Sequence, residues 1–108
     1  MRLRFLVLLL AGSCLSLSTI AADIGAGRMK ASSCAVCHGP QGLSVVPDAP
    51  NLAGQPPLYV VAQLKAYRDG TRKHEIMSLM AKPLSDADID DLAAWFGSLK
   101  VQVHSPSS

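Results

Sequence analysis

The stretch that decides the fold is Cys34-Ala35-Val36-Cys37-His38-Gly39, in which two cysteines three residues apart are followed at once by a histidine. Residues three and four apart lie on one face of a helix, about 5–6 Å from each other. On a helical turn, the two thiols and the imidazole can therefore approach one planar ligand together. Gly39 lets the chain turn away without placing a side chain against that ligand.

This spacing is the attachment pattern of a c-type haem, which two thiols bind covalently while the histidine binds the iron. Three other interpretations use the same residues. A thioredoxin-like redox pair requires a βαβ setting, and no strand-like alternation surrounds Cys34. A zinc site requires a second pair of ligands, and His74 and His104 are not spaced as one. A simple disulfide leaves His38 unused, whereas one covalent haem c accounts for all three side chains.

The first 22 residues are organised like a secretory signal, with two arginines, an apolar run over residues 5–12 and small residues up to Ala22. We therefore predict a signal peptide over residues 1–22. The apolar run is short for a membrane span, so a retained membrane anchor is a minor alternative, and none is expected in the mature chain. Lipid attachment at Cys14 is a further alternative, although the residues before Cys14 fit a lipoprotein signal poorly.

The charge balance gives no support to a nucleic-acid-binding role. The 108 residues include ten Lys and Arg, but Arg2 and Arg4 belong to the predicted signal. The eight that remain balance eight Asp and Glu, so no basic surplus is left for phosphate groups. The mature chain is also short and poor in aromatic side chains. We therefore expect a cofactor to complete its core.

Spacing and capping signals predict helices on both sides of the motif. One helix over residues 24–33 leads into Cys34. A second helix begins at Pro56 and Pro57 and ends at Gly70. Its expected core residues are Leu58, Val61, Ala62 and Leu64.

The remaining segments are expected to be two loops, a last helix and a tail. Residues 39–55 and 71–84 are interpreted as loops, the second with one short helical turn at most. Ser85 and Asp88 form a capping-box pattern that begins the last helix. The apolar stripe of this helix consists of Ile89, Leu92, Ala93, Phe96 and Leu99. We predict an all-α fold of three to five helices around one haem over residues 23–100, and a disordered tail over residues 101–108.

Several motifs follow one another in an order that can be compared with known families. They are Gly27-Arg28-Met29-Lys30, Cys34 to Gly39, Pro50-Asn-Leu-Ala-Gly-Gln55, Tyr59, Gln63-Leu64, Gly70-Thr-Arg72-Lys73, Ile76-Met77-Ser-Leu-Met80, Leu84-Ser85-Asp86 and Leu92-Ala-Ala-Trp-Phe96. In this order they resemble the small monohaem c-type cytochromes of the bacterial periplasm, and also one half of the periplasmic dihaem cytochromes c. The resemblance covers residues 24–99, and it implies that Gly27 permits close packing of the first helix on another helix.

The resemblance implies that the haem iron is held by a histidine and a methionine, a pair that raises the reduction potential. His38 is the first ligand. The family's methionine lies eight residues before the serine that caps the last helix, which selects Met77, with Met80 as the alternative. His74 competes only as an occasional ligand, and Met29 is expected to be an ordinary packing residue.

The resemblance also implies which residues surround the haem. The backbone carbonyl of Pro50 stands where relatives orient the ligating histidine. Arg72 stands where relatives place a cation near the haem propionates. Tyr59 and Gln63 are implied as further haem neighbours.

Two filled axial positions imply an electron-transfer protein and not an enzyme, because no substrate can then reach the iron. We expect a periplasmic one-electron carrier that shuttles electrons between respiratory or dehydrogenase partners by transient docking, as a monomer and without nucleic acid. Basic residues over 65–82 and acidic residues over 86–91 predict two faces of opposite charge. The alternatives are a haem-bearing subunit of an oxidoreductase complex, and a haem enzyme or sensor with an open sixth site.

Overall fold

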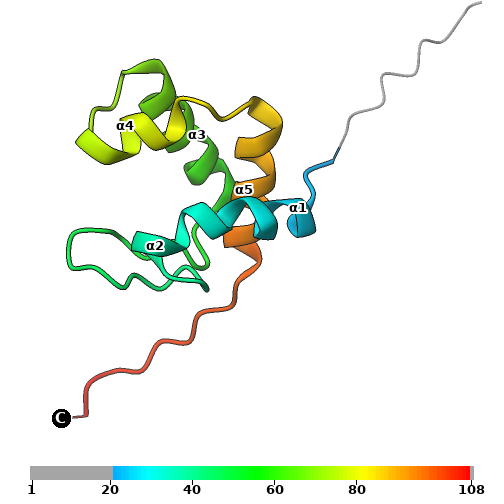
Figure 1. Ribbon diagram of the computed structural model, residues 1–108. Helices are drawn as coiled ribbons and strands as arrows, with labels where there is room; N and C mark the ends of the chain where they lie inside the picture. Colours follow the sequence, from blue (N-terminus) through cyan, green and yellow to red (C-terminus); the bar gives the residue numbers. More distant parts are fainter. Residues whose placement is uncertain (1–20, 108) are drawn as a thin grey trace, which may run out of the picture.

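The computed structural model describes residues 21–107, so that nearly all of the predicted signal, residues 1–20, lies outside the described residues. The described chain forms five α-helices and one short 3₁₀ helix, with no strand, and the predicted all-α class is confirmed (Figure 1). The elements are α1 (Ile24–Lys30), η1 (Ala31–Ser33), α2 (Ala35–His38), α3 (Pro57–Asp69), α4 (Glu75–Ala81) and α5 (Asp86–Ser98). None of the helices within residues 21–107 is long and apolar enough to cross a membrane.

The helix ends follow the local signals in the sequence. The side chain of Asp23 caps α1 by accepting a hydrogen bond of 3.0 Å from the backbone N–H of Ala26. Helix α3 begins at Pro57 and ends at Gly70, which adopts the left-handed conformation with φ +83°. Helix α5 begins with the predicted capping box between Ser85 and Asp88. The predicted boundaries of α3 and the predicted start of α5 are confirmed. The first helix is predicted over residues 24–33, but the α-helix ends at Lys30 and the chain continues as the 3₁₀ helix η1.

Helix α1 crosses α5 at Gly27, where the two backbones meet. A Cβ atom at Gly27 would overlap the backbone carbonyl of Asp91 and lie 2.9 Å from the Cβ of Trp95. Only a residue without a side chain fits there. The predicted role of Gly27 in close helix packing is confirmed.

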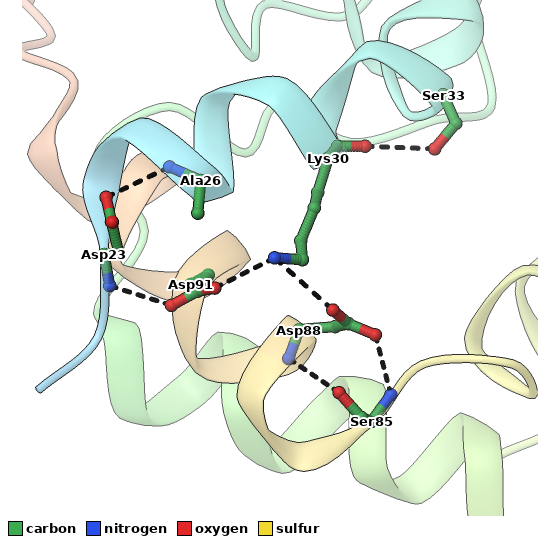
Figure 2. Close-up of polar contacts among 7 residues, drawn as sticks. All are labelled: Asp23, Ala26, Lys30, Ser33, Ser85, Asp88 and Asp91. Carbon is green, nitrogen blue, oxygen red and sulfur yellow. Dashed lines mark hydrogen bonds and ion pairs between the residues drawn. The ribbon is translucent and has the colours of Figure 1, made fainter. Parts of the chain in front are cut away.

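Polar contacts reinforce this crossing (Figure 2). The backbone N–H of Asp23 donates to the carboxylate of Asp91 at 2.8 Å. The Lys30 ammonium lies between two carboxylates of α5, 3.0 Å from Asp91 and 3.4 Å from Asp88. The backbone N–H of Asp23, and then Lys30, lower the pKa of Asp91. Asp88 likewise has a lowered pKa, chiefly because it accepts a hydrogen bond from the backbone of Ser85.

The core lies against α5 and is small. Within residues 21–107, seven apolar residues are buried, and three of them are alanines. The buried set is Ala31, Val60, Ala81, Ile89, Leu92, Ala93 and Phe96. The stripe predicted for the last helix is therefore confirmed, with Leu99 packed at its margin and only partly buried.

The core face predicted for α3 is wrong in part. Leu58 is 86% exposed and Ala62 is exposed, whereas Val60 is buried and Leu64 packs against the core. Two residues correspond to about 200° of rotation around a helix, so Leu58 and Ala62 lie opposite Val60. The apolar spacing fitted either face, and packing of α3 on α5 selected the one that contains Val60.

The second predicted loop is also wrong in part, because residues 75–81 form the seven-residue helix α4. Its N-cap is His74, whose side chain accepts hydrogen bonds from the backbone N–H groups of Ile76 and Met77. Histidine is not among the usual capping residues, so this helix start gave no sequence signal. Residues 101–107 have no regular secondary structure and are exposed, and their disorder stays a prediction.

Replacing Gly27 by Ala should destabilise the holoprotein by about 1–3 kcal/mol or more, because the new methyl group forces α1 away from α5. The free energy of unfolding in urea measures the loss. Gly25→Ala is the matched control in the same helix, since its Cβ would meet only the side chain of Asp23, at 3.3 Å. The control should change stability little or raise it, because Ala favours helix. Equal losses in the two variants would contradict the close crossing.

Acid should weaken the same crossing. The folded-state pKa values of Asp88 and Asp91 are lowered, so their contribution is complete above the ordinary pKa of about 4 and is lost as pH falls through the folded values. The urea midpoint of the wild type should therefore fall below about pH 4. Asp91→Asn should be less stable at pH 7 and show a flatter acid profile, whereas Asp90→Asn, outside this network, should keep the wild-type profile.

Candidate haem site

The two cysteines and the histidine lie on one helical turn, as the spacing predicts. The backbone N–H of His38 donates to the carbonyl of Cys34 at 2.9 Å, and that of Gly39 donates to Ala35 at 2.9 Å. Cys34 caps the start of α2, and Cys37 and His38 form its last turn. The two thiols are half-buried and not joined by a disulfide.

The chemistry of Cys34 argues against a redox-active thiol pair. Burial raises the pKa of the Cys34 thiol, and a hydrogen bond with Ser33 offsets this only in part. Redox-active thiols of the thioredoxin kind have lowered pKa values. A thiol that stays protonated and uncrosslinked suits permanent attachment to a cofactor better than disulfide exchange.

The imidazole of His38 is held in one orientation. The residue is 6% exposed, and its Nδ1 lies 2.7 Å from the carbonyl oxygen of Pro50. A carbonyl can only accept, so Nδ1 must be the donor, and the neutral ring then has its lone pair on Nε2. Nε2 has no hydrogen-bond partner within residues 21–107. Every fully buried side-chain nitrogen in these residues does have a partner, so Nε2 is not fully buried. Nε2 must therefore reach accessible space, which is where a metal ion could bind it.

The loop after α2 brings Pro50 to the histidine. Gly39 has φ +79°, and a side chain there would overlap the carbonyl of Leu43, so the reversal requires glycine. The carbonyl of Gly42 then accepts from the backbone N–H of Leu52 at 2.7 Å and of Ala53 at 3.0 Å. These bonds fold the loop back on itself and fix the position of the Pro50 carbonyl.

The candidate methionines lie on a helix and not in the expected loop. Met77 is half-buried and lies four residues before Ala81, the fully buried residue of α4, on the same helical face. Met80 is 40% exposed. Met29, on α1, is 78% exposed, so its expected packing role is wrong. Figure 1 shows α4 and α2 on the same side of the molecule, away from the crossing of α1 and α5.

The structure brings together two of the predicted haem neighbours. The Arg72 guanidinium donates to the side-chain oxygen of Gln63 at 2.6 Å and lies 4.7 Å from the ring centre of Tyr67. Tyr59, Gln63 and Tyr67 recur every four residues and so share one side of α3. Tyr59 itself is half exposed. Arg72 is thus a positioned cation at the surface of α3.

The basic and acidic residues that predict two faces of opposite charge are in contact at one point. Asp86, at the start of α5, lies 2.8 Å from the guanidinium of Arg68 and 3.9 Å from the ammonium of Lys65. Arg68 also donates to the backbone carbonyl of Leu84 at 3.0 Å. Part of the predicted basic face thus meets the first acidic residue of α5 where α3 packs on α5.

The donor set fits a c-type haem. Two free thiols can add to the two vinyl groups, an oriented imidazole offers nitrogen to the iron, and the thioethers of α4 offer sulfur. The small protein core is consistent with a large apolar cofactor as its complement.

The chain belongs to the cytochrome c family, because the family's cytochrome c model matches residues 22–100. Cytochrome c-554(548) of Halomonas halodenitrificans is 46% identical over 81 residues, which are 72% of this chain and 98% of that protein. Cytochrome c4 of Pseudomonas aeruginosa is 41% identical over 81% of this chain but 43% of its own length. The crystal structure of reduced cytochrome c4 from Pseudomonas stutzeri superposes with a TM-score of 0.71 at 40% identity, covering 77% of this chain and 48% of that one.

Membership of this family defines the chain as an electron-transfer protein with covalently bound haem c. The chain spans less than half the length of the c4 relatives and nearly all of cytochrome c-554(548). The predicted monohaem cytochrome class, its cofactor and its non-enzymatic role as an electron carrier are thereby confirmed.

Proposed function

We propose that this chain is a periplasmic one-electron carrier whose haem is attached through Cys34 and Cys37 and held axially by His38 and Met77. The observation that supports this most directly is the bond of 2.7 Å between His38 Nδ1 and the Pro50 carbonyl. That bond fixes the tautomer of the ring and directs Nε2 to accessible space, as the second hydrogen bond of most metal-bound histidines does. Haem c supplies reversible one-electron chemistry at its iron. The protein supplies a fixed ligand shell.

Met77 is the preferred second ligand for two reasons. It lies eight residues before Ser85, which caps α5 as the family spacing requires. It also faces inward with Ala81, whereas Met80 is more exposed. Both proposed axial ligands belong to helices, so the chain would hold these two side chains in place when the charge on the iron changes.

The loop and helix around these ligands have supporting roles in the proposal. Pro50 orients His38, and Arg72, held by Gln63 and Tyr67, offers a guanidinium to a haem propionate. Tyr59 continues this side of α3 toward the N-terminal end of the helix. Redox partners are proposed to dock at an edge of the molecule that includes the apolar side chains of Val36 on α2 and Ile76 on α4. These side chains are 76% and 52% exposed.

The partners are proposed to be respiratory or dehydrogenase proteins that dock briefly on this edge, with the carrier itself a monomer. Transient redox complexes have interfaces at the small end of the size range of protein–protein interfaces. A few exposed apolar side chains are enough to form an interface of that size. Export to the periplasm is proposed from the signal over residues 1–22, which lies almost wholly outside the described residues.

Haem should stay with the polypeptide through acid–acetone extraction of protein matured in a cell that attaches haem c. Two thioether bonds resist conditions that release a haem held only by axial ligands. Absorbance of the precipitated chain after extraction measures the retained haem. Cys34→Ala with Cys37→Ala should lose it, and haem washed out of the wild type would refute covalent attachment.

Met77→Ala should abolish the weak far-red absorption band that methionine sulfur gives with ferric haem iron, and should lower the reduction potential. Met80→Ala is the matched control on the same helix and should keep both. Oxidised spectra and a redox titration measure these properties.

If Met80→Ala loses the band and has the lower potential while Met77→Ala keeps both properties, the ligand is Met80. A wild type without the band would favour the haem with an open or histidine-filled sixth site over the carrier.

A further inference from the structure

Few interactions other than the N-cap stabilise the first turn of helix α4. It has seven residues, too few to be stable without help from the rest of the fold. It packs on α3, and Ala81 at its C-terminal end is its one fully buried residue. Ile76 and Leu79 are 52% and 71% exposed. The first turn, which contains Met77, therefore depends on its cap.

That cap is His74. The residue is extended, with φ −155° and ψ +137°, as an N-cap requires. Its Nδ1 accepts from the backbone N–H groups of Ile76 and Met77, each at 3.2 Å. In return, the backbone N–H of His74 donates to the Ser78 hydroxyl at 3.0 Å. This reciprocal arrangement satisfies donors at the helix start as a capping box does.

The imidazole is also in contact with α3. The rings of His74 and Tyr67 meet edge to face, with centroids 6.5 Å apart and an interplanar angle of 73°. Arg72 stacks on the same Tyr67 ring at 4.7 Å. His74 thus joins the Met77 backbone to the helix on which α4 rests.

We infer that His74 is a positioning residue for the iron ligand: its Nδ1 holds the Met77 amide, and so keeps the Met77 turn closed on the haem. The inference rests on the proposed ligation by Met77. In this arrangement His74 is not itself a ligand: Nδ1 accepts from the backbone, so the neutral ring carries its proton on Nε2 and has no free lone pair for the iron. An external ligand can reach the iron only after this turn opens, so the strength of the cap sets how readily Met77 is displaced.

Titration of the ferric holoprotein with imidazole, followed by loss of the far-red band, tests this inference. His74→Ala should bind imidazole roughly 2- to 30-fold more tightly, which is the range expected for loss of an N-cap. His74→Asn should restore the wild-type affinity, because Asn is a strong capping residue. Ser85→Ala is the matched control. It weakens the cap of α5 and the global stability, but should leave the imidazole affinity unchanged.

Three outcomes would overturn the inference: unchanged imidazole affinity in His74→Ala, no rescue by His74→Asn, or an equal shift in Ser85→Ala. Failure of the proposed ligation is recognised separately. It appears before any His74 variant is made, as a wild type without the band or as a band that survives in Met77→Ala.

Discussion

The rest of the structure depends on the crossing of α1 and α5 at Gly27. Helix α1 continues through η1 into the turn that contains Cys34 and His38, so the place where α1 lies on α5 fixes where the haem-binding motif lies. The contact admits no side chain, because a Cβ atom would overlap the Asp91 backbone. The ion pairs of Lys30 keep α1 from sliding along α5. Two ends of the chain, remote in sequence, thereby form one support for the haem site.

The histidine is oriented by a second, independent constraint. The crossing fixes the backbone of α2, but ring orientation comes from the Pro50 carbonyl, which the loop presents at 2.7 Å. A loop shaped by Gly39 and Gly42 can hold that carbonyl without regular secondary structure. The loop is ordered by its own hydrogen bonds and by contact with the core, because Leu52 packs against the core and the backbone N–H of Gly54 donates to the carbonyl of Phe96 at 2.8 Å.

Features that depend on local sequence were predicted well, whereas features that depend on tertiary packing were not. The caps at Ser85 and Gly70 were readable, because each uses chemistry within four residues of its own position. The motif at Cys34 was readable for the same reason. The buried face of α3 was not, since Val60 and Leu58 are equally apolar and only packing on α5 distinguishes them. The start of α4 was missed because a histidine replaced the usual Ser, Thr, Asp or Asn.

The pairing of charges between α3 and α5 bears on how such a carrier meets its partners. Arg68 forms a close ion pair with Asp86, and two opposite charges so close together have a field that falls off quickly with distance. With little net charge to guide it, a partner gains less from long-range steering than it would from two separated faces. In the proposed docking, recognition then depends on direct contact at exposed apolar side chains such as Val36 and Ile76. Contacts of that kind are short-lived when small, which suits a protein that must release its partner after one electron.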